Sequence, residues 1–158
     1  MEADYLEEAE LFGAIARSGA RVLLIGRRAL VALGLPVLTA DYDLWAHIDD
    51  LTMLNEALAP LGLYPNHAPP EARTRGRYVL ENGEKVDVLV ARQVATVDGT
   101  PVKFDEVWSR RQELPLGNIW FALPSLDDLI LTKQWGGRDK DVADIRLLEA
   151  LKQAGLGR

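Results

Sequence analysis

The chain has 158 residues, of which 48% are hydrophobic and 27% charged, and it contains no cysteine. This composition is typical of a soluble globular protein, and the length predicts one domain spanning residues 1–158. The lack of cysteine excludes disulfides, zinc–thiolate sites and thiol catalysis. A net charge of −6 argues against a general nucleic-acid coat, because phosphates attract positive charge. With no signal-peptide pattern and no apolar run long enough to cross a bilayer, we expect a cytoplasmic protein.

The first half of the chain alternates helices and strands. Helical spacing of apolar residues predicts a helix over residues 4–17, ended by Gly19. The rest of this half is predicted to form a short apolar strand (21–26), a helix (27–34), a strand (39–47) and a helix (50–62).

The second half begins with a hairpin and ends with helices. Residues 77–91 form two apolar runs around Asn82-Gly83, a strong hairpin turn. Residues 92–124 indicate short strands and turns around a helical turn near 105–111. Ser125 and Asp128 fit a capping box that opens a helix to about Gln134. A last helix is predicted over 139–153, with an apolar face of Val142, Ile145, Leu148 and Leu151.

This order of elements predicts the fold class. Strands flanked by helices, with a hairpin between them, favour an α/β (α+β) fold in which helices pack on a mixed β-sheet. We expect the core of the domain over about residues 20–91 and a C-terminal helical segment over about 125–153.

Two carboxylates stand out in the stretch TADYDLWAH, residues 39–47. Side chains alternate between the faces of a strand, so Asp41 and Asp43 project from the same face. Two interpretations remain open for that face. It is either the solvent side of an amphipathic strand, whose other face carries Tyr42 and Leu44, or a site that holds a cation.

A third carboxylate, Asp87, favours the cation site. It lies between Val86 and Val88 in an apolar run, and a carboxylate in a buried strand is costly unless it is paired or bound to metal. If this strand neighbours the one at 41–47, three carboxylates converge on one cation. Hard oxygen ligands without cysteine or clustered histidine indicate Mg²⁺, with Mn²⁺ as its alternative.

Glycine and arginine residues add a second feature. Gly26 joins a strand to a helix, and a glycine there lets the backbone approach a phosphate closely. Arginines recur at Arg27 and Arg28, and again with period two at Arg73, Arg75 and Arg77. On an extended segment the last three would share a face, either as a solvated strand edge or as contacts for a triphosphate or an RNA acceptor.

Together these residues resemble the nucleotidyltransferase superfamily of the DNA polymerase β type. The stretch LLIGRRALVALGLPVLTADYDL is similar to its small bacterial branch, which includes the AbiEii-like toxins and the minimal nucleotidyltransferases. The positions in register with that branch are Gly26, Ala29, Gly34, Pro36, Thr39, Asp41 and Asp43. Near the C-terminus, its lysine–aspartate segment is matched by Lys133, Lys140, Asp141 and Asp144.

The resemblance implies a nucleoside triphosphate bound with Mg²⁺ and a nucleotidyl group transferred to a hydroxyl of a small molecule, a protein or an RNA end. Asp41, Asp43 and Asp87 would be the catalytic metal ligands. Nucleotide contacts would come from Gly26, Arg27, Arg28, Thr39 and Lys133, although Lys133 fits a lysine on a helix surface equally well. Supporting or substrate contacts would come from Asp141, Arg75 and Arg77, although Asp141 fits a salt-bridged helix start equally well.

One departure keeps a second hypothesis open. The branch usually has Gly or Ser after the glycine at position 26, and this chain has Arg27. That arginine would either contact a phosphate or block the site. The alternative to an active transferase is therefore a catalytically weakened relative that acts as a binding module, such as a toxin–antitoxin component with a protein partner.

Overall fold

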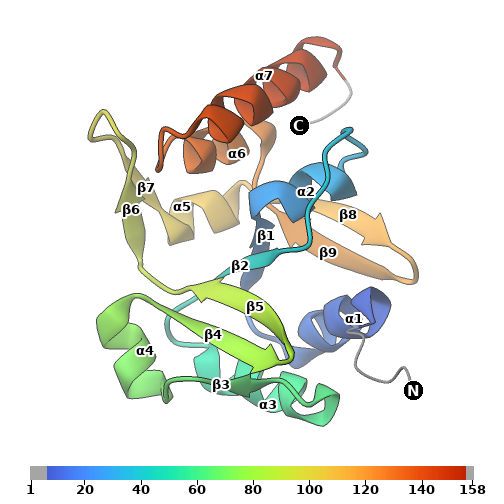
Figure 1. Cartoon of the computed structure of the whole chain (residues 1–158), viewed down its shortest axis with the longest axis vertical. Helices are drawn as coiled ribbons and strands as arrows, with labels where there is room; N and C mark the ends of the chain where they lie inside the picture. The colour runs from blue at the N-terminus through green and yellow to red at the C-terminus, as the bar shows by residue number, and fades with distance from the viewer. Residues whose placement is uncertain (1–6, 156–158) are drawn as a thin grey trace.

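The structure, a computed structural model, describes residues 7–155 (Figure 1). Helix α1 (Glu8–Ser18) ends at Gly19, as predicted, and the predicted start of this helix at residues 4–6 lies outside the described part. The first half continues with β1 (Val22–Ile25), α2 (Gly26–Ala32), β2 (Tyr42–Ala46), α3 (Leu51–Leu58) and a 3₁₀ turn, η1 (Ala59–Leu61). The predicted strand at 39–47 therefore starts three residues later than expected.

The middle of the chain follows the predicted hairpin. After β3 (Tyr64–Pro65) and α4 (Pro69–Arg75), strands β4 (Arg77–Asn82) and β5 (Glu84–Leu89) pair across Gly83. The remaining elements are β6 (Gln93–Ala95), β7 (Pro101–Lys103), α5 (Phe104–Ser109), β8 (Gln112–Leu116), β9 (Ile119–Leu123), α6 (Leu126–Lys133) and α7 (Asp139–Gln153). In Figure 1, α6 and α7 lie at one end of the molecule and α3 and α4 at the other.

A five-stranded mixed sheet in the order β1-β2-β5-β4-β3 forms the centre of the fold. Only the β2–β5 pairing is parallel, and the other three pairings are antiparallel. Two small sheets, β6–β7 and β8–β9, lie outside it. The predicted α/β fold with helices packed on a mixed sheet is confirmed.

One face of the central sheet is covered throughout its centre, and the other is covered over β1 and β2. One face packs Leu44 and Val88 against the main core, to which α1 and α3 contribute. The other face packs Trp45 against a smaller cluster that includes Phe104 and Val107 of α5. Because Trp45 is on the same face of β2 as Asp43 and is fully buried, that face is not the solvent side of an amphipathic strand. The side chain of Asp43 therefore lies at the edge of a covered surface.

The C-terminal helices differ from the prediction in one respect. Ser125 caps α6 by accepting a hydrogen bond from the backbone N–H of Asp128, as the sequence predicts. In α7, however, Val142 of the predicted apolar face is exposed, and the buried residues are Asp141, Asp144 and Leu148. The buried face of this helix therefore carries carboxylates. Among residues 7–155, no helix is both long and apolar enough to cross a membrane.

Candidate active site

Two carboxylates lie side by side where β2 and β5 run parallel. Asp43 and Asp87 are direct partners in the strand register, which puts their side chains on one face of the sheet about 4.8 Å apart at the backbone. Both line a cavity of about 560 Å³. The prediction that the strand carrying Asp43 neighbours the strand carrying Asp87 is confirmed.

The surroundings of Asp87 differ from those expected. Asp87 was predicted to be buried, but it is exposed, because the cavity leaves this part of the sheet face open while Val86 and Val88 point into the core. Asp43 is the half-buried member. Burial raises the pKa of Asp43, and the negative charges of Asp87 and Asp41 raise it further.

Asp41 does not join the pair as expected. It precedes β2, its side chain is exposed, and it is not among the described residues that line the cavity. Within residues 7–155, no three Asp, Glu, His or Cys side chains are close enough to hold a metal ion together. The predicted convergence of three carboxylates is therefore wrong for Asp41, which acts on Asp43 only through its charge.

Gly26 approaches the carboxylate pair at the start of α2. Its φ of +71° lies in the left-handed region, and a Cβ at this position would come within 2.6 Å of Oδ2 of Asp43. Both observations require glycine here. The backbone of Gly26 therefore forms one wall of the cavity beside Asp43.

Three other expected nucleotide contacts are engaged elsewhere. The Arg28 guanidinium lies over the Tyr42 ring, 4.2 Å from its centroid, and forms an ion pair with Glu8. The Thr39 hydroxyl accepts a hydrogen bond from the backbone of Asp41. Arg27 donates to Asp144 of α7, and none of these three residues is among the described ones that line the cavity.

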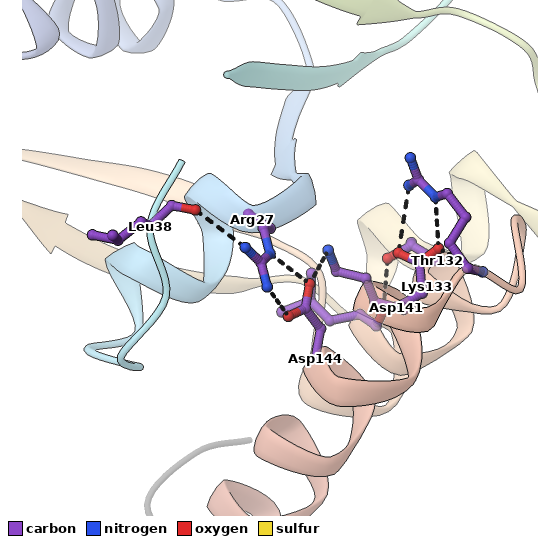
Figure 2. Close-up of polar contacts among 8 residues, drawn as sticks. Arg27, Leu38, Thr132, Lys133, Asp141 and Asp144 are labelled. Carbon is purple, nitrogen blue, oxygen red and sulfur yellow. Dashed lines mark hydrogen bonds and ion pairs between the residues drawn. The ribbon is translucent and has the colours of Figure 1, made fainter. Parts of the chain in front are cut away.

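Lys133 lines the cavity from the end of α6 and is held by Asp144 of α7. Its ammonium lies 2.9 Å from Oδ2 of Asp144, and the side chains of both residues are buried, 6% and 0% exposed. Arg27 donates to both oxygens of the same carboxylate, at 3.1 and 3.0 Å. Figure 2 shows Asp144 between these two cations. Burial alone would raise the pKa of Asp144, but the bonds from Arg27 and Lys133 outweigh burial and lower it.

Asp141 has a structural partner of its own. It accepts hydrogen bonds from the backbone N–H and the guanidinium of Arg138 at the start of α7. The salt-bridged helix start is thus the arrangement found, and the carboxylate bonded to Lys133 is Asp144 rather than Asp141. Both Asp141 and Arg138 line the cavity.

Arginines from α4 and β4 complete the cavity wall. Arg75 and Arg77 line it, whereas Arg73 bonds the backbone of Ile48. The expectation of three arginines on one extended face is wrong, because Pro69–Arg75 is a helix. The cavity nevertheless holds four cationic side chains against three carboxylates. The cations are Arg75, Arg77, Lys133 and Arg138, and the carboxylates are Asp43, Asp87 and Asp141.

Comparison with known proteins finds similarity only in structure. No family model and no curated protein matches the sequence. The lincosamide antibiotic adenylyltransferase LnuA, solved with lincomycin bound, matches with a TM-score of 0.63 and 16% identity over 92% of this chain and 98% of its own. The antibiotic-resistance factor ANT(2'')-Ia matches with a TM-score of 0.61 and 14% identity, over 89% and 79% of the two chains. A Thermotoga maritima protein described as a nucleotidyltransferase gives 0.61 and 12%, over 97% and 99%.

The chain has the nucleotidyltransferase fold. These identities are low, so the likeness extends to the arrangement of the elements and not to the chemistry of the cavity.

Within this nucleotidyltransferase fold, the cavity also contains an aromatic residue that the sequence did not single out. The Trp135 ring lines the cavity and packs edge-on against Trp45, with ring centroids 5.3 Å apart. Its indole N–H is buried and has no hydrogen-bond partner in the described part of the chain. A tryptophan following a helix end gives no functional signal in a single sequence, so only the structure places it here.

Proposed function

We propose that the protein binds a nucleoside triphosphate together with Mg²⁺ and transfers the nucleotidyl group to a hydroxyl acceptor. The observation that carries the proposal is the Asp43–Asp87 pair. Its members face the same cavity in strand register, and neither has an ion pair among the described residues. Neighbouring carboxylates repel each other unless a cation lies with them.

The donor set fits Mg²⁺ with a nucleotide present. In proteins Mg²⁺ is usually bound by one or two carboxylates together with substrate phosphates and water. Asp43 and Asp87 provide the two carboxylates, and the triphosphate would provide the other oxygens. Mn²⁺ favours the same oxygen ligands. The ion would neutralise charge that develops on the phosphates during transfer.

The cationic side of the cavity fits the triphosphate. Lys133 presents a buried ammonium beside the carboxylate pair, and its charge lowers the pKa of Asp43 against the effects of burial and of Asp87. Arg75 and Arg77 lie at exposed positions on the same cavity. We assign phosphate contacts to Lys133 and to the backbone beside Gly26, where the missing side chain admits a close approach.

The proposed reaction is an in-line displacement at the α-phosphorus. The acceptor oxygen forms a bond to that phosphorus, the bond from phosphorus to the bridging oxygen breaks, and pyrophosphate leaves with that oxygen. The hydroxyl proton passes to Asp87, the exposed member of the pair. The chain contributes by positioning and by fixed charge, which is most of what phosphoryl chemistry requires of a protein.

The alternative of a catalytically weakened binding module depended on Arg27. Its guanidinium is held by Asp144, and Arg27 is not among the described residues that line the cavity. Its bulk therefore does not fill the proposed nucleotide site. No contact among residues 7–155 favours a toxin–antitoxin role over transfer, so we place nucleotidyl transfer first.

The test is transfer of a label from each α-labelled nucleoside triphosphate in the presence of Mg²⁺ or Mn²⁺. Acceptors are an RNA fraction, a protein fraction and lincomycin, the last because LnuA is a lincosamide adenylyltransferase with this fold. Asp43→Asn and Asp87→Asn should each abolish labelling. Asp127→Asn, at an exposed position of α6 outside the cavity, should not.

Two results would overturn the proposal. The first is a wild type that neither binds a nucleoside triphosphate nor labels any acceptor. The second is labelling that survives in Asp43→Asn and Asp87→Asn at the level of Asp127→Asn, which would place the chemistry away from the carboxylate pair.

A further inference from the structure

We propose that Arg27 is a positioning residue for Lys133, acting through Asp144 to hold the lysine ammonium at the cavity wall and to keep that wall positively charged. This inference rests on the proposed function, since the group that Lys133 would meet is the triphosphate. Arg27 itself touches no ligand in this proposal.

Arg27 belongs to α2, Lys133 to α6 and Asp144 to α7, so one carboxylate joins three elements of the chain. Both oxygens of Asp144 accept from Arg27, and one of them also accepts from Lys133 (Figure 2). A bidentate arginine fixes the plane of a carboxylate, and the plane in turn fixes where the lysine ammonium lies.

The Arg27 guanidinium is also held from a second side. Its Nη1 donates to the backbone carbonyl of Leu38 at 3.2 Å, so all three of its nitrogens are engaged. Arg27 directly follows Gly26, whose backbone approaches Asp43. The same side chain therefore joins the wall that carries Gly26 to the wall that carries Lys133.

Arg27 also changes the net charge of the cluster around Asp144. A lysine paired with one carboxylate forms a nearly neutral group that attracts a phosphate weakly. With Arg27 added, two positive charges face one negative charge, and the cluster keeps one net positive charge. Lys133 and Asp144 are buried and the Arg27 side chain is 29% exposed, so this net charge is screened less than that of a surface ion pair.

The experiment compares Arg27→Gln and Arg27→Lys with a matched control. Arg110→Gln removes the same kind of contact, because Arg110 binds both oxygens of the buried Asp128 at 3.0 Å, outside the cavity. Arg27→Gln leaves Asp144 with Lys133, so the buried carboxylate keeps one cation. For each protein, calorimetry measures the dissociation constants of Mg²⁺-ATP and of inorganic tripolyphosphate, and a melt measures stability.

Arg27→Gln should weaken both ligands by roughly five- to tenfold, a coupling typical of residues in one ion-pair network. Arg27→Lys should recover most of that affinity because the charge returns, even though its melting temperature stays below that of the wild type. Arg110→Gln should lower the melting temperature and leave affinity within about twofold. A role in stability alone would make affinity follow the melting temperature in all three variants.

The inference is overturned if Arg27→Gln binds both ligands as tightly as Arg110→Gln does, or if Arg27→Lys recovers no affinity. These outcomes differ from a failure of the proposed function. A wild type that binds tripolyphosphate but no nucleoside triphosphate overturns the function, while the same comparison of variants on tripolyphosphate still decides the role of Arg27. A wild type that binds neither ligand overturns both.

Discussion

The carboxylate of Asp144 gives the sharpest prediction about stability. It is fully buried and is held by Arg27 on two oxygens and by Lys133 on one. Replacing either cation leaves the other in place. Arg27→Gln and Lys133→Met should therefore each cost only about 1–2 kcal/mol, the loss of charge-assisted hydrogen bonds.

The double variant should cost more than the sum of the single ones. With both cations removed, a charged group that no solvent reaches has no partner, a condition that costs about 3–5 kcal/mol in buried pairs. We expect a total loss of roughly 5 kcal/mol and a non-additive part of about 1–3 kcal/mol. For a chain of this size, that total corresponds to a fall in melting temperature of about 10–20 °C.

Urea unfolding at pH 7, with the slope of each transition compared, measures these losses. A triple variant that adds Asp144→Asn is the control, because it removes the buried charge and should recover most of the non-additive part. If the two single losses simply add in the double variant, the buried carboxylate does not depend on these two cations and the argument fails.

The pH dependence of stability in the same proteins tests the direction of the pKa shift of Asp144. Because its two partners lower the pKa of Asp144, its contribution to wild-type stability is present above the ordinary carboxyl pKa and is lost as the pH falls below that value. In the double variant the pKa of Asp144 should shift upward instead, because an unpaired buried carboxylate binds a proton more readily. Its deficit relative to the wild type should therefore shrink as the pH is lowered from 7 toward 4.

Three further predictions concern the cavity. Gly26→Ala should destabilise the protein more than Gly34→Ala does. Both glycines have positive φ, but only at Gly26 would a Cβ lie against Asp43. Equal losses of stability in urea unfolding would contradict this prediction. Asp43→Asn should leave the metal-free protein equally stable or more stable at pH 7. The pKa of Asp43 is raised in the folded protein, so its charged form costs stability above that pKa. In thermal melts, the stability gained by Asp43→Asn should disappear below the ordinary carboxyl pKa. The same variant should lose most of the melting shift that Mg²⁺ gives the wild type with a nucleoside triphosphate. Replacing Arg75 and Arg77 together by Gln should weaken triphosphate binding and flatten its salt dependence, whereas Arg73→Gln, outside the cavity, should leave both unchanged in titrations at several salt concentrations.

The arrangement of the carboxylate pair could be predicted from the sequence because it depends on strand geometry. Alternation along two apolar runs places Asp43 and Asp87 on defined faces, and parallel pairing then brings them together. What alternation cannot show is how much of each face is covered. The apolar neighbours of Asp87 indicated burial, but the cavity leaves its side of the strand open.

The cluster around Asp144 could not be predicted in the same way. Arg27 and Asp144 are 117 positions apart in the chain, and nothing in the sequence near either residue indicates the other. The apolar pattern of α7 also pointed to Val142, which is exposed, instead of Asp144. A helix face that buries a carboxylate against two cations has no apolar periodicity, so a search for periodic apolar residues cannot find it.

The unpaired state of Asp43 is the strongest argument that this cavity binds a cation. Every buried carboxylate in residues 7–155 has a basic partner. The pairs are Asp50 with Arg21, Asp128 with Arg110, Asp141 with Arg138, and Asp144 with Arg27 and Lys133.

Asp43, in contrast, has no basic partner among the described residues. It is half-buried, stands in register with another carboxylate, and has no hydrogen bond or ion pair among the described residues. Lys133 lies close enough to lower the pKa of Asp43, yet its ammonium is bonded to Asp144, and Arg138 on the same cavity is bonded to Asp141. Two of the cations that line the cavity, Lys133 and Arg138, are thus held by other carboxylates. The buried carboxylates elsewhere are paired, whereas the repulsion between Asp43 and Asp87 is not neutralised by a bonded side chain. A bound cation would relieve this repulsion.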